Sequence, residues 1–166
     1  MKFKYKQNLK NYAHINQTLK ELTTEIQINS NPEILWKVIT DFKNYYQWNP
    51  IIQKIIGEPL IGNELEIHLR TVGGKNRVYH PKVIKITPNH ELRWKGTFFF
   101  SQLFSGERIF LIEKLSENKV NFVNKEIFSG IGVRFTTQKM EDDILASFKK
   151  MNDALKKNLE QSLRKI

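Results

Sequence analysis

One amphipathic helix near the end of the chain constrains the fold more than any other stretch. Residues 136–166 lie in the longest run without glycine or proline. Its apolar residues recur at intervals of three or four positions, and they are Met140, Ile144, Phe148, Met151, Leu155 and Leu159. At about 100° per residue they fall within roughly 100° of arc, on one face of an α-helix. Burying each is worth about 1.5–3 kcal/mol before entropy, so the helix needs an apolar partner surface.

The ends of this helix are also marked in the sequence. Thr136 or Thr137 can cap its start, because a hydroxyl accepts a hydrogen bond from an unpaired N–H group. Acidic residues follow the caps and basic residues lie near the end, which suits the helix dipole. We therefore expect a helix from about residue 137 to 162.

Most of the remaining chain has the pattern of β-strands. Apolar, β-branched runs are separated by turn signals rich in Gly, Pro, Asn and Ser. These runs cover residues 22–29, 51–57, 64–72, 77–87, 91–99, 105–115 and 119–128. Because successive strands with short connections pair as antiparallel neighbours, the sequence predicts an antiparallel sheet crossed by the long helix.

A shorter helix is expected after the first strand. Ser30 with Glu33 can form a capping box, or Asn31 can cap a helix whose first residue is Pro32. The helical pattern weakens over residues 41–49, and Pro50 ends the helix.

Composition excludes several classes of function. The chain has no cysteine, and its four histidines show no metal-ligand spacing, so we expect neither a metal site nor a cofactor. The net charge of +10 could attract nucleic acid, but the lysines are scattered and no RNP, zinc or P-loop pattern accompanies them. The absence of cysteine and of a secretory signal pattern fits a cytoplasmic protein.

Residues 1–20 are expected to form a basic extension outside the domain, which would occupy residues 21–163. The extension carries five lysines and no acidic residue, and a short amphipathic helix is possible there. Weak contact with an anionic membrane surface is one alternative, and a frayed arm is another.

The stretch before the second strand resembles a known superfamily. Pro32-x-x-x-Trp36-x-x-x-x-Asp41-Phe42-x-x-Tyr45-x-x-Trp48-Asn49-Pro50 is similar to the opening of the START-like superfamily, which includes polyketide cyclase/dehydrase and lipid-transport proteins and the Bet v 1-like allergens. Looser matches such as Glu91-Leu92-x-Trp94-x-Gly96 extend the resemblance over about residues 22–160.

This resemblance implies an α+β helix-grip fold. In that fold an antiparallel sheet curves around a long C-terminal helix, two short helices follow the first strand, and a cavity lies between sheet and helix. It implies binding or transport of an apolar or amphipathic small molecule such as a lipid, isoprenoid or polyketide. The alternatives are an enzyme of the polyketide cyclase/dehydrase type and a co-chaperone-like interaction module. We expect a binding protein rather than an enzyme, and no residue is assigned a catalytic role.

The candidate cavity residues are mostly aromatic, and for most of the aromatic ones taken singly a plain hydrophobic core is the favoured alternative. The candidates are Trp48, Trp94, Phe98, Arg108, Phe110, Asn124, Glu126, Phe128, Met140, Ile144 and Phe148. Arg108 keeps its charge and needs a carboxylate, and Glu126 is the nearest by register. A structural ion pair and a ligand-facing pair both remain open. Members of the superfamily commonly carry histidine at the position of Arg108, so this chain departs from their pattern there.

Overall fold

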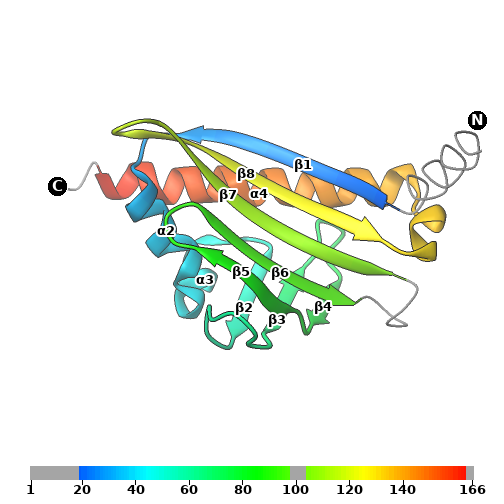
Figure 1. Ribbon diagram of the computed structural model, residues 1–166. Helices are drawn as coiled ribbons and strands as arrows, with labels where there is room; N and C mark the ends of the chain where they lie inside the picture. Colours follow the sequence, from blue (N-terminus) through cyan, green and yellow to red (C-terminus); the bar gives the residue numbers. More distant parts are fainter. Residues whose placement is uncertain (1–18, 98–103, 164–166) are drawn as a thin grey trace, which may run out of the picture.

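The computed structural model describes residues 19–97 and 104–163, and its elements form two antiparallel sheets and one long helix (Figure 1). The strands are β1 Leu19–Ile28, β2 Ile52–Ile56, β3 Glu66–Arg70, β4 Asn76–Tyr79, β5 Lys82–Thr87, β6 Glu91–Thr97, β7 Ser105–Ser116 and β8 Lys119–Ser129. The helices are α2 Pro32–Thr40, η1 Phe42–Asn44, α3 Tyr45–Trp48, η2 Ile131–Phe135 and α4 Gln138–Leu163.

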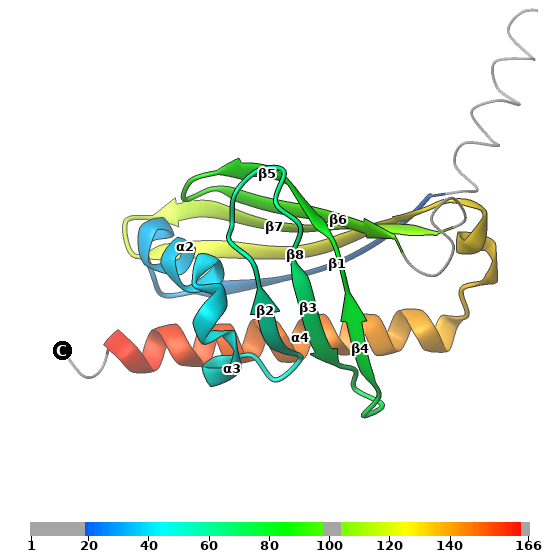
Figure 2. The same ribbon diagram turned by 90° about the horizontal axis from the view of Figure 1, so that it is seen from below.

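The larger sheet has the strand order β1-β8-β7-β6-β5. Its first and last strands in sequence are neighbours, and their register runs without a break from Leu19↔Ser129 to Ile28↔Val120. Leu19 and Lys20, which we had placed in the extension, are therefore strand residues. The helix α4 lies across one face of this sheet (Figure 2). The predicted helix-grip fold is confirmed.

The smaller sheet has the order β2-β3-β4, and its existence corrects the prediction of one strand over residues 77–87. The strand β4 ends at Tyr79 because Pro81 has no backbone N–H to continue the hydrogen bonds between strands. The Pro81 carbonyl instead accepts a hydrogen bond of 2.8 Å from the Leu65 N–H. A side chain at Gly96 of β6 would come within 3.2 Å of Pro81, so glycine permits this close approach. The strands of the smaller sheet run across the direction of the larger sheet's strands and pass beside α4, which packs directly on the larger sheet (Figure 2).

The apolar stripe of α4 faces inward along most of its length. Phe148, Met151, Leu155 and Leu159 are buried, whereas Ile144 is half-buried and Met140 is 48% exposed. Thr137 caps the helix, since its Oγ1 accepts a hydrogen bond of 3.3 Å from the Met140 N–H. The first turns of α4 therefore lie beside open space rather than packed core.

Of the two starts proposed for α2, the structure has the second. The Asn31 Oδ1 accepts a hydrogen bond of 2.8 Å from the Ile34 N–H, and Pro32 is the first helical residue. The helix leads through η1 into α3, so two short helices and a 3-10 turn follow β1.

Burial raises the pKa of the Tyr45 phenol above its ordinary value of 10.0. The folded state therefore favours the protonated phenol, and its contribution to stability falls as the pH rises above about 10. The hydroxyl donates a 2.7 Å hydrogen bond to the Ile39 carbonyl. We expect Tyr45→Phe to lower the free energy of unfolding by about 1 kcal/mol at neutral pH. We also expect the variant to lose less stability than the parent when the pH rises from neutral to above 10, as measured by urea unfolding under both conditions. An equal pH dependence of the free energy of unfolding in parent and variant would contradict this.

Candidate functional site

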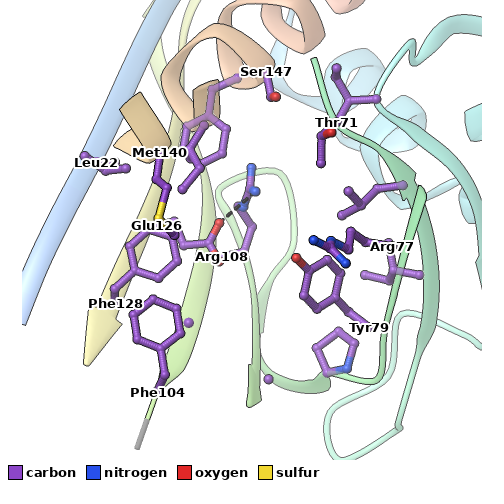
Figure 3. Close-up of a pocket in the computed structure, with 18 of the residues that line it drawn as sticks. Leu22, Thr71, Arg77, Tyr79, Phe104, Arg108, Glu126, Phe128, Met140 and Ser147 are labelled. Carbon is purple, nitrogen blue, oxygen red and sulfur yellow. Dashed lines mark ion pairs between the residues drawn. The ribbon is translucent and has the colours of Figure 1, made fainter. Parts of the chain in front are cut away.

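A pocket of about 480 Å³ lies between the larger sheet, the smaller sheet and the first half of α4 (Figure 3). Most of its described wall is apolar. The apolar lining residues are Leu22, Ile51, Ile52, Ile67, Leu69, Pro81, Trp94, Phe104, Phe128, Phe135, Met140, Ile144, Phe148 and Met151. Ligand pockets in proteins have this size and this kind of wall.

On the wall formed by β7 and β8 the pocket carries an ion pair. Arg108 and Glu126 are register partners on these strands, and their Nη2 and Oε2 atoms lie 2.7 Å apart. Their side chains are only 17% and 8% exposed. The predicted ion pair is therefore present, and it faces α4.

Two aromatic rings also hold the guanidinium of Arg108. Its central carbon lies 3.9 Å from the centroid of the Phe148 ring and 5.9 Å from that of the Phe110 ring. Cation–π contacts of this kind are worth about 0.5–2 kcal/mol, more when they are desolvated. Arg108 is thus fixed by charge on one side and by aromatic faces around it.

Behind Arg108 a chain of buried amides joins three elements. The Arg108 Nη1 donates a 2.9 Å hydrogen bond to the Asn124 Oδ1. The Asn124 Nδ2 donates to the Asn152 Oδ1 at 3.1 Å, and the Asn152 Nδ2 donates to the Thr24 Oγ1 at 3.1 Å. The last two bonds connect β8, α4 and β1, and all three satisfy polar groups that would otherwise be costly to bury.

The opposite wall comes from the smaller sheet. Tyr79 pairs with Ile67 and Arg77 with Leu69, so these four side chains share the pocket face of β3 and β4. Val78, on the other face, is 50% exposed. Burial first, and the charge of Glu126 second, raise the pKa of the Tyr79 phenol. Tyr79 therefore presents a protonated hydroxyl toward the pocket (Figure 3).

A second ion pair lies where β1 meets α4. The Lys20 Nζ is 2.8 Å from the Glu141 Oε2, and the Thr136 hydroxyl donates a 3.3 Å hydrogen bond to the other carboxylate oxygen of Glu141. Phe135, which also lines the pocket, is 77% exposed. This end of the pocket is therefore open to solvent.

The pocket collects many, but not all, of the candidate residues. Those that line it are Trp94, Arg108, Glu126, Phe128, Met140, Ile144 and Phe148. Phe98 lies outside the described residues.

Of the other three candidates, Phe110 and Asn124 lie in the packed interior and Trp48 is half-buried against it. Trp48 packs on Tyr45 with ring centroids 5.0 Å apart, because α3 covers the far end of the core. Phe110 is fully buried between Trp94 and Phe122. Asn124 is fully buried and bound to Arg108, which lies between it and the pocket.

Sequence reasoning missed Arg77 and Tyr79 on the smaller sheet. The signal was available, because strand alternation places Arg77 and Tyr79 on one face and Val78 and His80 on the other. It was not used because the whole run from 77 to 87 was treated as one ordinary strand.

Within residues 19–97 and 104–163 no group of three or more His, Cys, Asp or Glu side chains is arranged to hold a metal ion. No helix in the described part of the chain is long and apolar enough to cross a membrane.

A helix-grip domain with a largely apolar pocket under its C-terminal helix is the class that the fold and the site define. The chain belongs to the polyketide cyclase/dehydrase and lipid transport family, whose sequence model matches residues 20–160. No curated protein sequence matches the chain significantly.

Several solved structures share the fold at low sequence identity. A START superfamily protein from Mycobacterium smegmatis has 16% identity and a TM-score of 0.69, over 85% of this chain and 97% of that one. The Zhui aromatase/cyclase from Streptomyces sp. R1128 has 12% identity and a TM-score of 0.70, over 87% and 96% of the two chains. Norcoclaurine synthase from Thalictrum flavum has 15% identity and a TM-score of 0.66, over 89% and 91%. At these identities the comparison defines the fold.

Proposed function

We propose that this protein binds an apolar or amphipathic small molecule in the pocket between its two sheets and α4. The observation that carries the proposal is the pocket itself, which has about 480 Å³ of space beneath a predominantly apolar wall. Covering a water-exposed apolar wall with a ligand is favourable by about 25 cal/mol for each Å² of apolar surface that is buried. The family's description includes lipid transport, which supports the same class of ligand.

Binding fits the polar residues of the β7–β8 wall better than catalysis does. General acid–base catalysis needs a group that can gain or lose a proton near neutral pH. Arg108 cannot do so, and it is engaged by Glu126, Asn124 and Phe148. This favours a binding or transport protein over the cyclase/dehydrase alternative.

A substitution that fills the pocket tests the proposal. Ser147 lines the pocket from α4 and is half-buried, so a larger side chain there can enter the space without displacing core residues. We expect Ser147→Trp to weaken saturable binding of a neutral, environment-sensitive apolar dye by about tenfold or more.

Lys149→Trp is the matched control, because Lys149 lies on the same helix but is exposed and does not line the pocket. It should leave dye binding unchanged, and both variants should keep the melting temperature of the parent to within a few degrees. Equal dye binding by the parent and Ser147→Trp, with both proteins folded, would contradict the proposal.

A further inference from the structure

We infer that the ligand is an amphiphile with a single anionic head group, a carboxylate, and that Arg77 binds this group at the edge of the pocket. The inference rests on the proposed binding function and adds the charge of the ligand and the residue that selects it. It is carried by the balance of charges in the pocket wall and by the position of Arg77.

The charges of the side chains in the described pocket lining do not sum to zero. Lys20, Arg77 and Arg108 are cationic, whereas Glu126 and Glu141 are anionic, which leaves one positive charge. Arg108 is paired with Glu126 and Lys20 with Glu141, at 2.7 and 2.8 Å. The remaining charge is therefore that of Arg77.

Arg77 has no ion pair or hydrogen bond from its side chain to another residue of the described chain. Its guanidinium points from β4 toward the interior of the pocket, on the same side as the Tyr79 hydroxyl (Figure 3). A guanidinium offers two parallel N–H donors that match the two oxygens of a carboxylate.

Arg108 is less suited to this role, although it is the more buried arginine. One of its terminal nitrogens is bound to Glu126 and the other to Asn124, and the Phe148 ring covers its face. A ligand carboxylate there would have to displace Glu126 or lie beside it, and two like charges in one partly buried site repel each other.

The position of Arg77 also sets the orientation of the ligand. Arg77 is exposed, whereas Trp94, Phe128 and Phe148 on the opposite wall are buried. An amphiphile can place its apolar part against these rings and keep its head group at the solvent edge on Arg77. Such an arrangement leaves the carboxylate partly hydrated and avoids the cost of burying it.

Three ligands with the same apolar chain and different head groups test the inference. Dodecanoate, 1-dodecanol and dodecyltrimethylammonium would each displace a neutral apolar dye from the protein below their critical micelle concentrations. At a pH near 8 the carboxylate is ionised, since the ordinary carboxyl pKa is about 4. We expect dodecanoate to bind about tenfold more tightly than dodecanol, and the cation to bind more weakly than either.

Substitutions then assign the preference to Arg77. Arg77→Gln should remove the advantage of dodecanoate over dodecanol, whereas Arg77→Lys should keep part of that advantage. Arg70→Gln removes the same charge from an exposed position of the neighbouring strand β3 that does not line the pocket. It should keep the preference, which separates a contact at Arg77 from general attraction to a basic protein.

The outcomes separate this inference from the proposed function. Equal binding of dodecanoate and dodecanol, or a preference that survives Arg77→Gln, would overturn the role of Arg77 while leaving the pocket as a binding site. Failure of all three ligands and of the dye to bind would overturn the proposed function itself.

Discussion

Replacing Arg108 by methionine is expected to lower the free energy of unfolding by about 3–5 kcal/mol. The change leaves Glu126 as a charge with only 8% of its side chain exposed, and it removes the donor to the Asn124 Oδ1. An unpaired buried carboxylate is costly because the protein interior solvates it poorly. Urea unfolding of the parent and the variant, followed by circular dichroism, measures the difference.

A double variant separates the charge effect from lost packing. Arg108→Met combined with Glu126→Gln removes both charges, so it should be more stable than Arg108→Met alone. Arg70→Met provides a control, because Arg70 is exposed and does not line the pocket, so this variant should unfold close to the urea concentration of the parent. If Arg108→Met unfolds at the same urea concentration as the parent, the ion pair contributes no net stability and the account of this wall is wrong.

Phe148→Ala is expected to cost a similar amount, about 3–5 kcal/mol, through lost burial and the cavity left behind. Phe148 is 2% exposed and packs in a cluster with Leu22, Phe128 and Val133. It also supplies the ring that lies 3.9 Å from the Arg108 guanidinium carbon. The loss of that contact adds to the loss of packing, and together they should lower the urea concentration at which half of the protein is unfolded.

Phe135→Ala is the matched control, since the same atoms are removed from a ring that is 77% exposed. Exposed substitutions usually change stability by less than about 0.5 kcal/mol. A Phe148→Ala protein that is as stable as Phe135→Ala would mean that this face of α4 is not part of the packed core.

Periodicity was sufficient to predict the elements that are regular. The spacing of Phe148, Met151 and Leu155 predicted which face of α4 is buried, and strand alternation predicted that Arg108 meets Glu126. Both depend on local geometry that a sequence carries directly.

Alternation could not predict how deep an inward-facing residue lies. Trp94 and Phe110 both face inward and touch each other, yet only Trp94 borders the pocket. Asn124 has the expected orientation, but Arg108 lies over it. Depth depends on where the pocket ends along the sheet, and that is decided by the packing of distant elements.

The smaller sheet illustrates a second limit. The proline at position 81 was visible in the sequence, but its effect depends on tertiary structure. It separates β4 from β5, so that β4 joins the smaller sheet and forms part of the pocket wall. Arg77 and Tyr79 reach the site because the strand ends before Pro81, and the alternation of apolar and polar residues around them does not show this. A proline inside a predicted strand is therefore a reason to consider a change of sheet.

Native mass spectrometry tests the central claim most directly, namely that the pocket binds an apolar or amphipathic molecule. The freshly purified protein would be measured before and after incubation with a lipid extract, alongside Ser147→Trp. We predict a bound species of one small molecule per chain, which organic extraction removes and which Ser147→Trp reduces strongly. A spectrum that shows only the mass of the chain under both conditions, or a bound species unaffected by Ser147→Trp, would contradict it.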